Sequence, residues 1–144
     1  MTKKILIVVG TRPNFVKITQ FKKNAKNFPD LEVKIAHTGQ HYDQRMSAVF
    51  LEQFNIEVDY FLGVSATSAN SLIGEIIIAL ESVINNYKPD ILLCVGDVNS
   101  TLAAAISANK LGVKLGHLES GLRSLDRQMP EEVNRILTDE ITDI

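Results

Sequence analysis

The chain has 144 residues, of which 45% are apolar and 22% are charged, which allows one hydrophobic core and is too short for two ordinary domains. A formal net charge of -2 and a pI near 5.9 disfavour nucleic acid and an anionic membrane surface as partners, because both attract basic proteins. The one cysteine, Cys94, permits no internal disulfide, and no apolar run reaches the roughly 20 residues of a membrane helix, so we expect a cytoplasmic protein.

Apolar runs of strand length recur along the chain, and helical patterns separate them. The strand-like runs are residues 5–9, 33–36, 91–95 and 113–118, with a weaker run at 60–64. The helical patterns cover residues 13–26, 43–54, 71–87, 100–111 and 130 onward. Strands rich in Ile, Val and Leu that alternate with helices predict an α/β fold, namely a doubly wound, Rossmann-like parallel sheet built from residues 1–144.

The last helical pattern carries an apolar stripe that continues to the final residue. Its members are Val133, Ile136, Leu137, Ile141 and Ile144. No glycine or proline follows the stripe to end a helix. The pattern therefore predicts a chain that stops inside a helix, with exposed apolar side chains that favour association.

The segment after the first strand has the composition of an anion-binding loop. Gly10 permits a tight turn, and Pro13 opens a helix whose first amide groups face the same end of the sheet. Arg12 offers two parallel donors to a phosphate, and Lys17 adds a point charge. Alternatively, both cations are ordinary solvent-exposed residues at the start of a helix. The loop lacks the G-x-G-x-x-G pattern, which disfavours dinucleotide cofactors.

Acidic residues follow two later strands, where open α/β sheets place ligand chemistry. Asp97 comes directly after the run at 91–95, although an aspartate in such a turn is often only a helix cap. Glu119 ends the run at 113–118, with Arg123 close behind it. His117 shares a strand face with Glu119, but a histidine in an apolar strand is more often a hydrogen-bonded core residue.

Two further carboxylates, Glu131 and Glu132, follow Pro130 in the first turn of the last helix. Acidic residues are favoured there by the helix dipole whatever their function. Taken together, however, several carboxylates near Arg and Lys fit acid and base chemistry on a phosphorylated substrate.

Other kinds of chemistry find little support in the sequence. The histidines are scattered at positions 37, 41 and 117, without the spacing of a metal site, and we expect neither a metal nor a cofactor. A G-x-S-x-G elbow and a Walker loop are both missing from the sequence.

Five motifs in this order resemble the non-hydrolysing UDP-N-acetylglucosamine 2-epimerases: GTRPNFVK, TGQHYDQ, KPDILLCVGDVNST, GHLESGLRS and MPEEVNRILTD. The resemblance implies two Rossmann-like domains of the glycosyltransferase-B type with the active site between them. Residues 1–144 correspond to the N-terminal domain, and the C-terminal UDP-binding domain is absent from this chain. It also implies a homodimer in the full-length enzyme and a role in polysaccharide biosynthesis.

The reaction of that family explains the need for carboxylates. Loss of UDP from C1 makes the hydrogen on C2 removable, and re-addition of UDP after protonation on the other face converts UDP-GlcNAc into UDP-ManNAc. By resemblance, Asp97, Glu119 and Glu131 form the acid and base set. Arg12 and Lys17 would bind the phosphate side of the substrate.

The resemblance assigns a weaker binding role to two more residues. Gln40 and His41 would contact a second, activating substrate molecule, and Arg123 is a further substrate-binding candidate. The sequence departs from the family at Asn14, where an acidic residue is common, and at Ser120, where alanine is usual. Without the second domain, activity of this chain alone is in doubt.

Two other functions fit the same residues. The chain is alternatively a nucleotide-sugar-binding Rossmann module without turnover, or the acceptor-side half of a glycosyltransferase. The three carboxylates favour the epimerase over the glycosyltransferase, because glycosyl transfer does not require acid and base groups at C2.

Overall fold

The protein forms a five-stranded parallel sheet in a computed structural model that describes residues 1–39, 49 and 51–144. The spatial order of the strands is β3-β2-β1-β4-β5. Their bounds are Lys3–Val9 (β1), Leu31–His37 (β2), Tyr60–Phe61 (β3), Ile91–Val95 (β4) and Lys114–Leu118 (β5). All paired strands run parallel, so every strand ends at the same edge of the sheet, called here the carboxyl edge.

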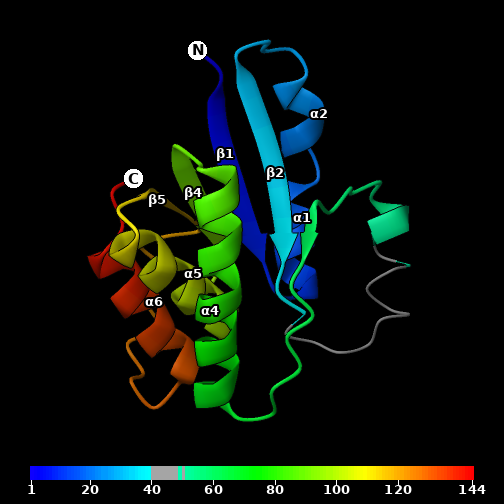
Figure 1. Cartoon of the computed structure of the whole chain (residues 1–144). Coiled ribbons are helices and arrows are strands. Elements are labelled where there is room, and N and C mark those ends of the chain that lie inside the picture. Colours follow the sequence, from blue (N-terminus) through cyan, green and yellow to red (C-terminus); the bar gives the residue numbers. More distant parts are fainter. Residues whose placement is uncertain (40–48, 50) are drawn as a thin grey trace.

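Helices cover both faces of this sheet, which confirms the predicted doubly wound fold (Figure 1). The helices are Arg12–Ile18 (α1), Phe21–Ala25 (α2), Ala69–Tyr87 (α4), Asn99–Lys110 (α5) and Pro130–Glu140 (α6). The strand order reverses its direction between β1 and β4, because the chain first builds outward to β3 and then returns to the other side of β1. Ligand sites in open α/β sheets form outside the strand ends at this switch point.

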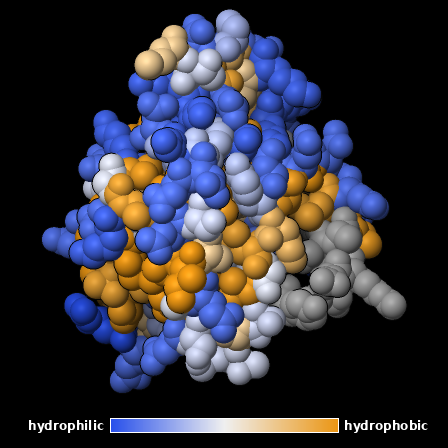
Figure 2. Space-filling model, viewed as in Figure 1, coloured by the Kyte–Doolittle hydropathy of each residue, from blue (hydrophilic) through white to orange (hydrophobic). Residues whose placement is uncertain are grey.

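Each face of the sheet has its own apolar core. On one face, α4 and α5 pack on Leu6, Leu92 and Leu115, and the small residues of α5 at 103–105 and 108 allow that helix to approach closely. On the other face, Phe15 and Ile18 of α1 pack with residues of β1 and β2. The outer surface retains an apolar area over α4, visible in Figure 2, where Ile78 is 71% exposed. Within the described ranges, no helix is long and apolar enough to span a bilayer.

The strands lie at their predicted positions, although the weaker run at 60–64 forms only the short strand Tyr60–Phe61, and one helical prediction needs correction. The pattern at 13–26 forms two helices rather than one, with a break at Thr19 and Gln20 between α1 and α2. Two β-branched residues, Ile18 and Thr19, lie at the start of this break, and such residues are weak helix formers. Most of the pattern at 43–54 lies outside the described residues.

The chain does not stop inside a helix as predicted, because α6 ends at Glu140. The last residues instead run beside β5. The amides of Asp143 and Ile144 both donate to the carbonyl of Leu115, at 3.0 and 3.1 Å, and the carbonyl of Ile144 accepts from the amide of His117 at 3.0 Å. These bonds satisfy backbone groups along the outer strand, which favours leaving the helix over extending it.

Candidate active site

Loops from three strands and the start of α6 meet at the carboxyl edge. The loop after β1 carries Arg12 and leads to Lys17, the loop after β4 carries Asp97, and the loop after β5 carries Glu119. The first turn of α6 carries Glu131. The parallel sheet therefore brings Arg12, Lys17, Asp97 and Glu119 to one edge, and α6 adds Glu131.

Asn14 organises the loop after β1. Its side-chain oxygen accepts from the amides of Gly10 and Thr11, at 3.2 and 3.1 Å, and from the Thr11 hydroxyl at 3.2 Å. Its amide nitrogen donates to the carbonyl of Val95 at 3.2 Å, which fastens this loop to the end of β4. A carboxylate could accept the first three bonds but could not donate the fourth. Asn14 therefore has a structural reason to replace the acidic residue common in the resembling family.

The same bonds correct one part of the anion-loop prediction. The amides of Gly10 and Thr11 donate to Asn14 and do not face a ligand, and Pro13 has no amide hydrogen. The charged groups that this loop and helix offer to an anion are the side chains of Arg12 and Lys17. Arg12 is exposed at the first position of α1, and Lys17 lies one to two turns further along.

Lys17 forms an ion pair with Glu119, across the end of the sheet. The pair is partly open to solvent, with the two side chains 36% and 38% exposed. Glu119 adopts a left-handed backbone with φ of +74°, a conformation that non-glycine residues rarely take. Such strain at a sheet edge is typical of functional positions. Gly96 lies behind the pair, and a Cβ there would sit 3.1 Å from Nδ2 of Asn14 and 3.7 Å from Oε2 of Glu119.

Asp97 pairs with Arg135 of α6, a residue that we did not predict. Its Oδ2 accepts from Nε and Nη2 of Arg135, at 3.0 and 2.9 Å. The pKa of the Arg135 guanidinium is raised, mainly because it donates a hydrogen bond to Asp97. Asn134 donates to the carbonyl of Asp97 at 2.9 Å, so α6 holds both the side chain and the backbone of this residue. Arg135 lies four residues after Glu131 in the MPEEVNR motif, and this helical spacing could have identified it.

The two adjacent glutamates of α6 have different surroundings. Glu132 is 1% exposed, accepts from the amides of Ser124 and Leu125, and pairs with Nη1 of Arg135 at 2.6 Å. The hydrogen bond from Ser124 is the main cause that lowers the pKa of Glu132. Glu131 is exposed and makes no ion pair or side-chain hydrogen bond with another described residue. Glu132 is therefore a structural residue, whereas Glu131 is available to a ligand.

Arg123 bonds to a carboxylate of α6 that is not among the predicted site residues. Its Nη1 donates to Oδ2 of Asp139 at 2.7 Å, and Asp139 also contacts the buried His117 at 2.5 Å. Burial opposes ionisation of Asp139, but hydrogen bonds from Arg123, Gly121 and His117 outweigh it and lower the pKa of this carboxyl. Arg123, one of the predicted binding residues, is therefore part of a structural network with Asp139 and His117.

His37 is the last residue of β2, at the carboxyl edge. It is 1% exposed, stacks on Phe15 with ring centroids 4.9 Å apart, and accepts from the amide of Gly39 at 2.8 Å through Nδ1. Burial lowers the pKa of His37 to about 4, so the ring is neutral at pH 7. The two other predicted binding residues of this region, Gln40 and His41, lie outside the described residues.

The arrangement suits proton transfer on an anionic substrate. Asp97 and Glu119 each form an ion pair with a cation at this edge. Glu131 shares the helix face of Arg135, at i and i+4, and therefore lies on the side of α6 that meets Asp97. The edge thus offers three carboxylates, with Arg12 and Lys17 to attract negative charge.

Comparison with known proteins gives a consistent result. The sequence model of a family described as UDP-N-acetylglucosamine 2-epimerase (Epimerase_2) matches residues 23–144. A Pseudomonas aeruginosa protein named UDP-2,3-diacetamido-2,3-dideoxy-D-glucuronate 2-epimerase is 44% identical over 142 residues, covering 98% of this chain and 40% of its own length. A Methanocaldococcus jannaschii UDP-N-acetylglucosamine 2-epimerase is 39% identical over 140 residues, covering 96% of this chain and 38% of its own.

Solved structures agree with the sequence comparison. The crystal structure of the Methanocaldococcus jannaschii UDP-GlcNAc 2-epimerase with UDP-GlcNAc and UDP has a TM-score of 0.90 at 38% identity, over 96% of this chain and 38% of that one. The Neisseria meningitidis UDP-GlcNAc 2-epimerase bound to UDP-GlcNAc gives 0.90 at 33% identity over the same shares. The chain spans about 40% of the length of the curated relatives that it matches.

Proposed function

Because this chain belongs to the UDP-N-acetylglucosamine 2-epimerase family, we propose that it is the N-terminal, Rossmann-like domain of an enzyme that interconverts UDP-GlcNAc and UDP-ManNAc. The enzyme would be an isomerase of the non-hydrolysing kind, acting by elimination and re-addition of UDP. The supporting observation is the set of carboxylates and cations at the carboxyl edge, where Asp97, Glu119 and Glu131 lie with Arg12 and Lys17.

The ion pairs suggest how the proton work is divided. Epimerisation at C2 requires one group that removes a proton and another that returns a proton from the opposite face. Asp97 and Glu119 are each held beside a cation, so we assign them the roles that need a negative charge. Glu131 has no cationic partner among the described residues, and we assign it the delivery of a proton.

The cations serve the leaving group in this proposal. UDP departs as a pyrophosphate that carries developing negative charge, and positive side chains stabilise such charge. Lys17 is already paired with Glu119, so a phosphate at this edge would compete for the same ammonium. That competition would release Glu119 from its cation as the substrate binds.

A second substrate deserves testing alongside UDP-GlcNAc. The relative from Pseudomonas aeruginosa is 44% identical and acts, by its name, on UDP-2,3-diacetamido-2,3-dideoxy-D-glucuronate. Both substrates are UDP sugars with an acetamido group at C2, and both reactions invert C2. The same carboxylates would serve either reaction, because the two sugars differ at C3 and C6.

The test follows the sugar protons by NMR in deuterium oxide. The chain is incubated with UDP-GlcNAc, with UDP-2,3-diacetamido-2,3-dideoxy-D-glucuronate, and with each sugar plus the C-terminal remainder of the Methanocaldococcus jannaschii relative. The proposal expects epimer with deuterium at C2 in the combined sample. A combined sample that folds and associates yet incorporates no deuterium from either sugar would contradict it and favour a binding module without turnover.

Three further features of the whole enzyme belong to this proposal. A C-terminal domain would supply most of the uridine site, the full-length protein would be a cytoplasmic homodimer, and its product would serve polysaccharide biosynthesis. Gln40 and His41 would contact an activating second substrate, and Arg123 would reach the substrate only if it left Asp139.

A further inference from the structure

One buried imidazole connects the two loops that carry Asp97 and Glu119. The side chain of His117, in β5, is fully buried. Its Nε2 lies 2.6 Å from the carbonyl oxygen of Gly96, in the peptide bond that joins Gly96 to Asp97. Its Nδ1 lies 2.5 Å from Oδ1 of Asp139. The ring therefore links the loop after β4 to helix α6.

Asp139 continues this link to the second loop. Its Oδ2 accepts from the amide of Gly121 at 3.0 Å, and Gly121 lies two residues after Glu119. The same oxygen accepts from Nη1 of Arg123 at 2.7 Å. Both ends of the network therefore meet backbone groups close to a candidate catalytic carboxylate, and neither end touches the carboxylate itself.

The partners of His117 determine where its protons are. A carbonyl oxygen can only accept a hydrogen bond, so Nε2 must carry a hydrogen to bond Gly96. A further proton lies between Nδ1 and the carboxylate of Asp139 if that contact is also a hydrogen bond. The ring therefore donates to Gly96 whether or not it carries a full charge.

The position of Gly96 shows why this hydrogen bond matters. Gly96 has a φ of +75°, and its Cα faces Asn14 and the Lys17–Glu119 pair. Its amide donates to the carbonyl of Leu118 at 3.0 Å, which joins the end of β4 to the residue before Glu119. Rotation of the Gly96–Asp97 peptide would thus move Asp97 relative to Glu119.

We propose that His117 is a positioning residue that sets the relative placement of Asp97 and Glu119 by donating from Nε2 to the carbonyl of Gly96, with Asp139 orienting its ring. This proposal rests on the function proposed above, because it assigns those carboxylates a shared reaction. Its structural half, the hydrogen bond from Nε2, stands independently of turnover. Small displacements of catalytic groups can cost roughly 100-fold in rate, which sets the scale of the expected effect.

The structural half is tested on the chain itself by NMR with ¹⁵N-labelled histidine. At neutral pH the proposal expects a protected Nε2–H resonance of His117 with a nuclear Overhauser contact to Asp97. A ring that is unprotonated at Nε2 would overturn the proposal, because the bond to Gly96 could not form. This readout requires neither substrate nor the second domain.

Two matched substitutions separate the two hydrogen bonds of the ring. The amide nitrogen of H117Q reaches the place of Nε2 and keeps the bond to Gly96, whereas that of H117N reaches the place of Nδ1 and keeps only the bond to Asp139. In the combined sample with the C-terminal remainder, we expect H117N to lose roughly 10- to 100-fold in kcat with KM little changed. H117Q should retain most of the activity, and the amide resonances of Asp97 and Val98 should shift in H117N more than in H117Q.

The opposite order, with H117N active and H117Q impaired, would overturn the proposal and reduce His117 to an anchor for α6. Equal losses that follow the melting temperatures of the two variants would also overturn it. If the unsubstituted protein shows no turnover, the proposed function fails, but the NMR comparison of the two variants still decides the positioning role.

Discussion

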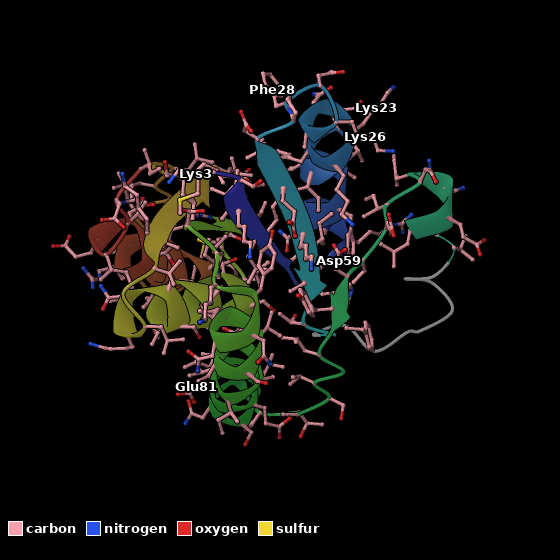
Figure 3. The ribbon with its side chains drawn as sticks, turned by 45° about the horizontal axis from the view of Figure 1, so that its top comes forward. Lys3, Lys23, Lys26, Phe28, Asp59 and Glu81 are labelled. Atoms are coloured by element: carbon pink, nitrogen blue, oxygen red, sulfur yellow. The ribbon has the colours of Figure 1, made fainter. Side chains whose placement is uncertain are left out.

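The two edges of the sheet contain polar residues of similar kinds but hold them in different ways. At the amino edge, where the strands begin, Asp90 accepts from the side chain of Lys3 at 3.1 Å and from the amide of Lys4 at 2.8 Å, and the side chains of Lys3 and Asp90 are 67% and 38% exposed. Figure 3 shows Lys3, Lys23, Lys26 and Phe28 standing out at this edge, where the loop between α2 and β2 lies.

At the carboxyl edge two of the polar side chains are buried and have several partners each. Glu132 is 1% exposed and His117 6% exposed, and each bonds groups from two different loops or helices. A buried polar group must be satisfied, whereas an exposed one exchanges its partner for water at little cost. Polar contacts therefore fix the positions of side chains around Glu132 and His117 more tightly than around Asp90.

The sharpest contrast within the carboxyl edge is between its neighbouring glutamates. E131Q should lower the C2 exchange rate of the combined sample by roughly 100-fold or more, because a general acid or base is removed, and it should leave the melting temperature unchanged. E132Q should lower the melting temperature, because its amide nitrogen would face backbone donors or Arg135. Thermal unfolding and deuterium exchange measured on both variants provide the check, and reversed roles would contradict our assignment.

His37 should make the stability of the carboxyl edge depend on pH. Its pKa is about 4 in the folded protein and about 6.5 in the unfolded chain, because burial disfavours the charged ring. The unfolded state therefore binds the proton first, and stability falls as the pH drops from about 6.5 to about 4. Between pH 7 and pH 5 the loss from this group should be about 2 kcal/mol.

Urea unfolding at the two pH values measures this loss. H37N is the control, because its side-chain oxygen can still accept from the amide of Gly39 and its side chain does not titrate. The difference between the two proteins isolates the histidine from the carboxylates. An equal pH dependence in H37N would show that His37 is not the cause.

Backbone packing at the carboxyl edge should tolerate little added volume. A Cβ at Gly10 would lie 2.2 Å from Oγ and 2.6 Å from Cβ of Ser100, so G10A should destabilise the fold by about 2 kcal/mol. The matched control is G74A in α4, where a Cβ meets no atom within 4 Å. Because alanine favours helix, G74A should stabilise by up to about 1 kcal/mol. A neutral G10A would mean that the carboxyl edge is looser than we describe.

The amino edge should hardly respond to the loss of its ion pair. In D90N the side-chain oxygen can still accept from the amide of Lys4, and only the exposed contact with Lys3 weakens. We expect an unchanged urea midpoint at low and high salt. A clear loss of stability in D90N would remove the contrast between the two edges.

The fold was largely predictable because buried parallel strands leave an unambiguous signal. The runs at 5–9, 33–36, 91–95 and 113–118 coincide with observed strands to within one residue or contain no residue outside them, and the loops after the last two carry Asp97 and Glu119. The helix boundaries were less certain. The turn after Glu140 depends on tertiary hydrogen bonds, namely those of Asp143 and Ile144 to Leu115.

The candidate site was predictable by position but not by partner. A sequence places Asp97 and Glu119 at one edge of the sheet, yet it cannot show that Arg135 pairs with the first and Lys17 with the second. Similarly, His117 was correctly expected to be a hydrogen-bonded core residue, but its bond to Gly96 crosses between strands. Contacts between residues far apart in sequence depend on loop geometry, which local patterns do not encode.

We propose that the carboxyl edge of this chain alone forms the substrate-facing half of the site. NMR of the chain with ¹³C-labelled Asp and Glu carboxyls, titrated with UDP-GlcNAc, tests this claim without requiring turnover. We predict that the carboxyl signals of Asp97, Glu119 and Glu131 move while that of Asp90 stays in place. Shifts confined to the amino edge, or saturating binding that moves none of the three signals, would contradict the account.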